Sequence, residues 1–220
     1  MTDDLFDAEF ADAARAIQRE TVAHVVRQKT AAIIRKQSRL QLRRAKSEET
    51  LAAVLPDRLP AGYSAHIISA GDVDALSFVA HIAKHHRRLD EVLISSWCLA
   101  LPDIEWLEQQ QSANRIGDLR FYCGEILRAT YPDTYDAICR LERAKKATLA
   151  ISRNHAKVTL IKTGDARYTI ESSANLNTNP RIEQTAIHTD PDLHAFYDAF
   201  FSAIHCIDAK NRRQEQACRT

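Results

Sequence analysis

The sequence predicts an α/β protein in which helices flank a mixed sheet, preceded by an N-terminal α-helical extension. Strand and helix patterns alternate between residues 63 and 144, four strands then follow one another between residues 148 and 189, and almost no glycine or proline interrupts residues 5–54. Alternation of strands and helices indicates a mostly parallel sheet with helices on its faces. The uninterrupted helical pattern near the N-terminus indicates a separate helical segment.

The N-terminal extension has apolar residues at helical spacing, which predicts one or two long helices between Leu5 and Val54. Pro56 and Pro60 then break the helical pattern and mark a linker. We therefore divide the chain into a basic helical extension with its linker, a main domain and a polar C-terminal tail. Their bounds are residues 1–60, 61–208 and 209–220.

The first six elements of the main domain alternate between strand and helix. They are a strand at 63–69 and a helix at 72–86, a strand at 91–97 and a helix at 102–112, and a strand at 119–123 and a helix at 132–144. The period of the apolar residues switches between that of a strand and that of a helix. Asp103 and Glu105 lie in the first turn of the second helix, where the helix dipole favours negative charge.

In the rest of the main domain the predicted strands follow one another directly. Four strands are predicted at 148–152, 157–162, 168–172 and 183–189, with no helix between them. A turn at Thr163-Gly164-Asp165 separates the second of these strands from the third. An amphipathic helix at 192–207 closes the domain.

Composition sets the outer bounds of the protein class. With 220 residues, 45% hydrophobic and 27% charged, the chain can bury one good-sized core and a smaller appendage. The five cysteines form no CxxC pair and are odd in number, which argues against a disulfide framework or zinc site and for a reducing cytosol. The N-terminus lacks a basic region followed by an apolar core, and no long apolar run occurs elsewhere. We therefore expect a soluble, cytoplasmic protein without stable membrane association.

The residues that carry chemistry gather between residues 155 and 183. His155-Ala-Lys157 stands at the head of an apolar alternating strand, Ser172-Ser173-Ala174-Asn175 follows one hairpin later, and Glu183 opens the next strand. Because side chains alternate along a strand, the imidazole and the ammonium share one face, as do the second hydroxyl and the carboxamide.

These residue types suit a phosphate ester. A neutral imidazole can attack phosphorus and leave again, and the ammonium can meet the same phosphoryl group. The hydroxyl and the carboxamide can donate to the charge that builds on its oxygens. A carboxylate bound to one ring nitrogen fixes the tautomer and leaves the other nitrogen free to act. This set needs no metal and no other cofactor.

The motifs resemble the phospholipase D superfamily, whose pattern runs His-x-Lys, four residues, Asp, then Gly-Ser-x-Asn and a downstream Glu. The resemblance covers about residues 65–207 and implies a phospholipase D-like mixed sheet flanked by helices. It implies these catalytic residues: His155, Lys157, Ser173, Asn175 and Glu183. Two positions depart from the pattern, because Lys162 stands where the family has Asp and Ser172 where it has Gly.

Supporting residues are expected near this set. The acid nearest to the departure at Lys162 is Asp165, and the corresponding Asp of the family is structural. Ser95-Ser96-Trp97-Cys98 ends a strand of the alternating part, and open α/β sheets bind ligands beyond such strand ends, although Trp97 is equally expected to be buried under a helix. Arg181 follows a turn and is placed to contact phosphate. The supporting candidates are Asp165, Ser172, Ser95, Ser96 and Arg181.

The proposed chemistry predicts a homodimer. One histidine must attack and a second must protonate the leaving oxygen, yet the chain has one motif. In the family that the motif resembles, members with a single motif dimerise. We therefore expect a twofold axis that brings His155 of both subunits into one site.

The extension carries the strongest charge asymmetry of the chain. Its basic residues between Arg27 and Lys46 are accompanied by no acid, so this helix is expected to bind a phosphodiester backbone without reading its sequence. A solvated helix that packs through its apolar residues is the competing interpretation. The nucleic-acid-binding candidates are Arg35, Lys36, Arg39, Arg43 and Arg44.

Three functions follow in order of preference. The first is a metal-independent nuclease that acts through a phosphohistidine in a dimeric site, with DNA favoured over RNA. The second is a nucleic-acid-binding protein that keeps the fold and has lost turnover, which the departures at Lys162 and Ser172 would allow. The third is a phospholipid phosphodiesterase.

Overall fold

The computed structural model describes residues 35–177 and 181–217, with side chains described for 42–177 and 181–204. The chain forms two compact units, Met1–Arg43 and Arg44–Thr220. Of the first unit, the description covers the opening turns of α2 (Arg35–Val54). The helices expected from Leu5 to residue 34 lie outside the described residues.

The second unit begins inside α2, earlier than the domain boundary expected at residue 60. Leu51 is fully buried and Leu55 is 8% exposed, and both belong to the main hydrophobic core. Ser47 is also buried and donates a hydrogen bond to the carbonyl oxygen of Asp72 at 2.7 Å. The last turns of α2 therefore belong with the sheet domain.

The sheet has seven strands in the order β1-β7-β6-β5-β2-β3-β4. The strands are β1 (Ser64–Ala70), β2 (Leu89–Ser96), β3 (Ile116–Gly124), β4 (Ala147–Ser152), β5 (Val158–Lys162), β6 (Arg167–Ser172) and β7 (Ile182–His188). Each coincides with a strand that the sequence predicts, with ends shifted by a few residues.

The sheet is mixed, as the fold class predicts, but it is not mostly parallel. β2 pairs in parallel with β3, and β3 with β4, whereas the other four pairs are antiparallel. β1 accounts for part of the difference: although a helix follows it, it pairs with β7, from Ser64 opposite His188 to Ala70 opposite Ile182. Pairing between strands so distant in the chain is not encoded in local periodicity.

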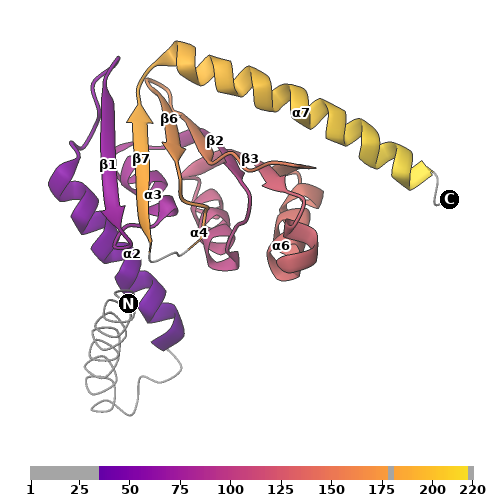
Figure 1. The fold of residues 1–220 in the computed structure, drawn as a ribbon, viewed down its shortest axis with the longest axis horizontal. Coiled ribbons are helices and arrows are strands. Elements are labelled where there is room, and N and C mark those ends of the chain that lie inside the picture. The colour runs from indigo at the N-terminus through magenta and orange to yellow at the C-terminus, as the bar shows by residue number, and fades with distance from the viewer. Residues whose placement is uncertain (1–34, 178–180, 218–220) are drawn as a thin grey trace, which may run out of the picture. The chain divides into compact units, whose positions relative to one another are not determined.

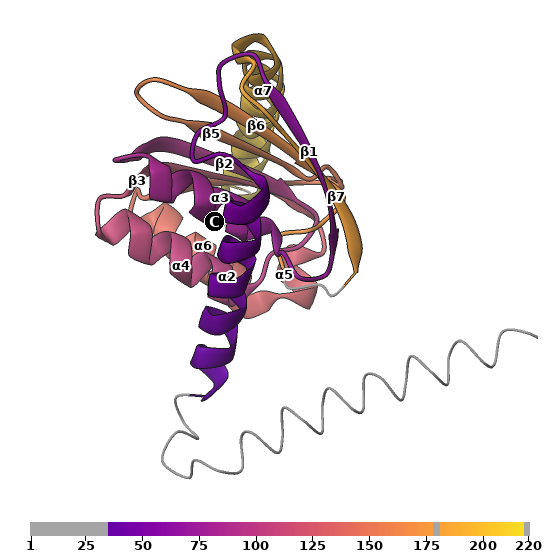
Figure 2. The ribbon, with the colours of Figure 1, turned by 90° about the vertical axis from the view of Figure 1, so that its left-hand side faces the viewer.

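Helices cover both faces of the sheet. They are α3 (Ala75–His85), α4 (Leu101–Ser112), α5 (Leu127–Thr130), α6 (Pro132–Arg143) and α7 (Pro191–Ala217). α7 lies on the opposite side of the sheet from α3, α4 and α6 (Figures 1 and 2). α5 was not predicted, because one turn is too short to show a helical period. α7 extends beyond the expected end at residue 207 into the expected tail 209–220, a stretch without glycine or proline.

The core forms two layers that follow the alternation of the strands. Ile94 of β2 packs in the larger layer, on the side of α3, α4 and α6. Its neighbour Leu93 points to the other face and packs with Phe201 of α7. β2 is therefore buried on both faces, as a central strand of a layered α/β fold must be.

One edge of the sheet gathers the residues that the sequence singles out. Ser96 at the end of β2 lies opposite Cys123, and Ser95 lies opposite Val158 at the start of β5. Val158 in turn lies opposite Glu171, next to the end of β6. The carboxyl ends of the parallel strands and the start of β5 therefore meet at the same edge, where the candidate site forms.

Candidate active site

The imidazole of His155 and the ammonium of Lys157 are in contact. His155 is exposed in the segment between β4 and β5, and Lys157 directly precedes β5. Nζ of Lys157 lies 2.9 Å from Nδ1 and 3.3 Å from Nε2 of His155, and it also donates to the His155 carbonyl oxygen at 2.8 Å. An ammonium has only donors, so it can bind to this ring only through a nitrogen that carries no proton. The pair therefore places an imidazole ring beside an ammonium group.

Partial burial affects this ammonium. It holds the pKa of Lys157 below its ordinary value, while the nearby Cys98 and Glu183 side chains oppose the shift. A partly desolvated cation interacts more strongly with an anion than a fully hydrated one. Lys157 is thus suited to compensate charge on a bound phosphoryl group.

Asn154 holds the segment that carries His155, a role that the sequence analysis did not predict. Its amide nitrogen donates to the Tyr122 carbonyl oxygen at 2.8 Å and to the Ser95 hydroxyl at 2.9 Å. Its amide oxygen accepts from the backbone N–H of Ala156 at 3.0 Å. The hydroxyl of Ser95 in turn donates a hydrogen bond to the Ala156 carbonyl oxygen at 3.1 Å. One side chain thus ties the segment to the ends of β2 and β3.

Trp97 borders the histidine. The ring centroids of Trp97 and His155 are 5.4 Å apart, with the planes inclined at 46°. Behind it, Gly124 leaves room for close packing: a Cβ there would lie 2.5 Å from Cδ1 of Trp97 and 3.0 Å from the Asn154 carbonyl oxygen. Trp97 is half-buried, and not fully buried under a helix as the competing expectation had it.

A small cavity lies next to Lys157. It has a volume of about 20 Å³, and the polar side chains that line it are Ser95, Ser96, Lys157, Thr159 and Ser172. Ser95 and Ser96 are 2% and 1% exposed. These two supporting candidates therefore lie beneath the surface and line the cavity from the protein interior. Such a volume holds about one water molecule. It has no room for an alkyl chain.

The two serines of the second motif have different surroundings. Ser172 lines the cavity, and its hydroxyl lies 2.9 Å from the Thr185 hydroxyl and donates to the Gln184 carbonyl oxygen at 3.1 Å. Ser173 is exposed and donates a hydrogen bond to the carboxylate of Glu183. The partner of this carboxylate is thus a serine, where the sequence led us to expect the imidazole.

Asn175 contacts the buried side chain of Ser96. The hydroxyl of Ser96 lies 3.4 Å from the amide oxygen of Asn175 and accepts from the backbone N–H of Leu176 at 3.1 Å. A parallel bridge between Leu99 and Leu176 holds the same loop to the end of β2. Asn175 therefore belongs to the same sheet edge as His155, through the buried serine.

Asp165 does not belong to the site. It lies in the turn between β5 and β6, at the opposite end of these strands from Lys157. There it accepts hydrogen bonds from Thr163 and from Arg58 of the linker, both at 3.0 Å, and lies 3.5 Å from the ring of His86. The Thr163 hydroxyl, more than the nearby cations, keeps the pKa of Asp165 below its ordinary value. Asp165 therefore binds its own turn and the linker, away from Lys157, and it cannot support catalysis directly.

Of the expected basic surface, Arg44 needs correction. Its side chain is 16% exposed and donates at 2.6 Å to Asp103, and its guanidinium lies 5.5 Å from the ring centroid of Trp106. Arg44 is therefore a packing residue against α4 and not a free contact for nucleic acid. The side chains of Arg35, Lys36 and Arg39 lie outside the described residues, and Arg43 stays a candidate. Arg181 is exposed at the start of β7.

Among the residues that the structure describes, no three His, Cys, Asp or Glu side chains come together in a group suited to hold a metal ion. In the same part of the chain, no helix combines the length and the apolar character needed to cross a membrane.

No family model and no curated protein matches the sequence. Solved structures similar to this fold include the archaeal chromatin protein TrmBL2, described as showing a novel mode of DNA binding, at 10% identity over 92% of this chain and 68% of that chain, with a TM-score of 0.49. They include polyphosphate kinase from Porphyromonas gingivalis, at 15% identity over 64% and 26%, with a TM-score of 0.48. They also include phosphatidylserine synthase from Haemophilus influenzae, at 10% over 65% and 38%, with a TM-score of 0.48.

Members of the phospholipase D superfamily, which the sequence motifs resemble, are among these structures. This chain covers less than two thirds of the length of either enzyme. At such identities and TM-scores the similarity says nothing about activity.

Proposed function

We propose that the chain is a phosphodiesterase of the phospholipase D type, a metal-independent nuclease with His155 as its nucleophile. The observation that carries this proposal is the contact between the ammonium of Lys157 and the ring nitrogens of His155, at 2.9 and 3.3 Å, on a sheet edge that also holds Ser173, Asn175 and Glu183. A solvent-facing His and Lys on an ordinary edge strand would not be expected to have a serine, an asparagine and a glutamate at the same edge of the sheet.

In the first step Lys157 exchanges its contact with the ring for one with the phosphoryl oxygens, and the ring nitrogen of His155 that carries no proton forms a bond to phosphorus while the bond to the leaving oxygen breaks. Lys157 then lies beside the phosphoryl oxygens, where charge increases as the reaction proceeds. Asn175 and Ser173 supply neutral donors at the same edge. Water displaces the imidazole in the second step, which releases the phosphate ester and restores the histidine.

Each step also moves one proton. The leaving oxygen takes a proton in the first step, and the attacking water loses one in the second. A second imidazole can perform both transfers, and we assign this role to His155 of a twofold-related copy. In such a dimer the two rings face each other about 5 to 8 Å apart, the span of a bound phosphate. Glu183 is then expected to turn from Ser173 to the imidazole and to orient it.

Nucleic acid is the substrate that the described residues favour. The cavity at Lys157 holds about 20 Å³, so it accepts water and not an acyl chain, and the remainder of a substrate must lie on the surface. A polymer whose phosphates are exposed meets this condition. Exposed arginines at 153 and 181 lie in the segments that lead to His155 and to Glu183, where they can contact neighbouring phosphates.

The test is cleavage of plasmid and single-stranded DNA in excess EDTA by the protein and by His155→Asn. We expect cleavage by the unaltered protein and none by the variant, with DNA binding retained. Cleavage that vanishes in EDTA and returns with Mg²⁺ contradicts the metal-independent mechanism. DNA binding without cleavage by either protein would instead support a binding protein that has lost turnover.

A further inference from the structure

Trp97 lies beside the proposed nucleophile. Its ring centroid is 5.4 Å from that of His155, and the side chain is partly exposed although the residues on either side of it are buried. Most partly exposed tryptophans border an apolar core, but this one borders the proposed nucleophile.

The position of the indole is fixed from behind. Gly124 has no side chain, and a Cβ there would come within 2.5 Å of Cδ1 and 2.7 Å of the carbonyl oxygen of Trp97. Ser96, its neighbour, is 1% exposed and its hydroxyl donates to the Cys98 carbonyl oxygen at 2.7 Å. An aromatic ring held on a rigid strand end, with part of its surface free, offers a planar surface at low entropic cost.

The size of the cavity beside Lys157 limits where a substrate can lie. Its volume is about 20 Å³, so a nucleoside or an alkyl group attached to the phosphate cannot enter it. Such a group must lie against the surface beside His155, where Trp97 is the adjoining aromatic ring. Planar groups stack well on indole, and every nucleobase is planar.

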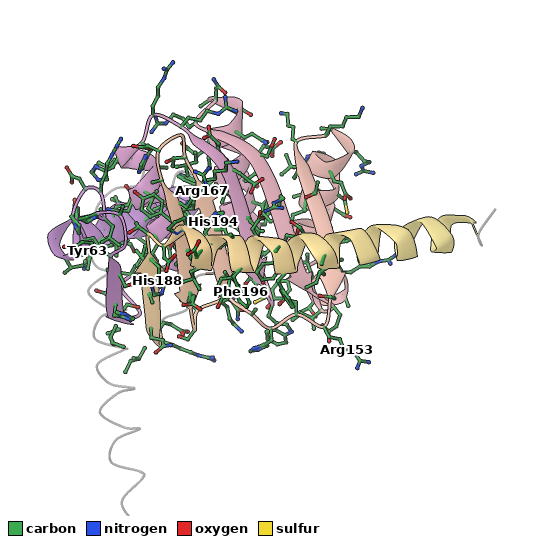
Figure 3. The ribbon with its side chains drawn as sticks, turned by 90° about the horizontal axis from the view of Figure 1, so that it is seen from above. Tyr63, Arg153, Arg167, His188, His194 and Phe196 are labelled. Carbon is green, nitrogen blue, oxygen red and sulfur yellow. The ribbon has the colours of Figure 1, made fainter. Side chains whose placement is uncertain are left out.

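We propose that Trp97 stacks on a nucleobase next to the scissile phosphate, so that the site takes single-stranded nucleic acid. This inference rests on the proposed function and specifies its substrate. In a duplex both faces of a base are already stacked, and freeing one face costs energy that a single strand does not pay. Arg153, two residues before His155, is exposed and projects outward in Figure 3, where it can contact a flanking phosphate.

The experiment uses Trp97 as its own reporter. The chain has two tryptophans, and Trp106 lies in α4 beneath the Arg44 guanidinium. Full-length Trp106→Phe with His155→Asn leaves one tryptophan and prevents cleavage. Its fluorescence is titrated with a single-stranded decanucleotide, the same strand in a duplex, and an abasic oligomer of equal length and charge.

We expect the single strand to quench the fluorescence and to bind more tightly than the duplex or the abasic oligomer. In the His155→Asn background, Trp97→Ala should weaken binding of the single strand by about 5- to 150-fold, measured by anisotropy of a labelled strand, and leave the abasic oligomer unaffected. Arg153→Gln should instead weaken the binding of the single strand and of the abasic oligomer alike. It should also reduce the slope of log K against log salt concentration by about 1. Trp97→Phe should restore most of the lost affinity.

Equal affinity for the single strand and the abasic oligomer, or unchanged affinity in Trp97→Ala, overturns the inference. Hydrolysis of bis(p-nitrophenyl) phosphate by the unaltered protein separates this failure from that of the proposed function. If the small diester is hydrolysed but the single strand does not quench Trp97, the substrate assignment is wrong and the phosphodiesterase stands. If quenching occurs without any hydrolysis, the base-stacking surface stands and the proposed reaction is wrong.

Discussion

The ammonium nitrogen of Lys157 lies 2.9 Å from Nδ1 of His155 and 2.8 Å from the carbonyl oxygen of the same residue. One lysine thus fixes both the ring and the backbone of the residue two positions before it. Replacing Lys157 by Ala should lower kcat by about 10²- to 10³-fold, because developing phosphoryl charge loses its counter-charge. Lys162→Ala, at the far end of β5, is the matched control and should keep full activity. Equal rates in the two variants would refute the role of Lys157.

Asn154 should prove to be a positioning residue. Asn154→Ala removes three hydrogen bonds that tie the His155 segment to Tyr122, Ser95 and Ala156. We expect kcat to fall at least about tenfold while the affinity for DNA stays close to that of the unaltered protein. Asn177→Ala, which removes one weak contact to Cys98 at 3.4 Å, is the control. Loss of binding in parallel with kcat would argue against positioning.

Two glycines give a sharp comparison of packing. Gly124→Ala places a methyl group 2.5 Å from Trp97 and 3.0 Å from the Asn154 carbonyl oxygen, so it should lower the free energy of unfolding by about 1–3 kcal/mol and impair cleavage. Gly164→Ala meets no atom within 4 Å and should leave the stability nearly unchanged. Urea denaturation measures both variants. A Gly124→Ala protein as stable and active as the unaltered one would contradict the packing of Trp97.

The shared site can be tested by mixing subunits. Equal amounts of the unaltered protein and His155→Asn are unfolded together and refolded. If both imidazoles are needed in one site, mixed dimers are inactive and the activity per total unaltered subunit falls to about half that of the unmixed protein. Independent monomers retain full activity per unaltered subunit. Sedimentation of each preparation establishes the oligomeric state at the concentration of the assay.

Asp103 should make the stability depend on pH. Burial, opposed by Arg44, raises the pKa of this carboxyl from 3.8 to about 7. The folded state therefore binds more protons than the unfolded state between these values, and the contribution of Asp103 to stability falls as the pH rises from about 4 to about 7. Asp103→Asn keeps an acceptor for Arg44 and should lose this part of the slope. Parallel stability curves for the two proteins between pH 4 and 7 would contradict the shift.

Much of the fold could be predicted because its signals are local. The switch between strand and helix periods located all seven strands. Strand alternation also led us to expect His155 and Lys157 on one face; the two side chains do meet, but they do so in the segment before β5 and not on a strand. The topology could not be predicted in the same way. Whether β1 pairs with β2 or with β7 depends on contacts between residues more than a hundred positions apart, such as Ser64 and His188.

The candidate site was predictable in its residue types but not in its contacts. Asn154 carries no signal, because a lone asparagine before a strand is common, and its role depends on the Ser95 hydroxyl of β2 and the Tyr122 carbonyl oxygen of β3. Arg44 looked like part of a basic surface, since the sequence does not show that Asp103 of α4 lies against it. Contacts between residues so far apart in the chain leave no local pattern in the sequence.

The stereochemical course at phosphorus tests the central claim most directly. A substrate with a chiral phosphorothioate at the scissile bond is cleaved in excess EDTA, in water labelled with ¹⁸O, and the configuration of the product is determined. Each in-line displacement inverts the phosphorus centre, so attack by His155 followed by attack of water gives net retention. Inversion would mean that water attacks directly, and it would contradict the assignment of His155 as the nucleophile.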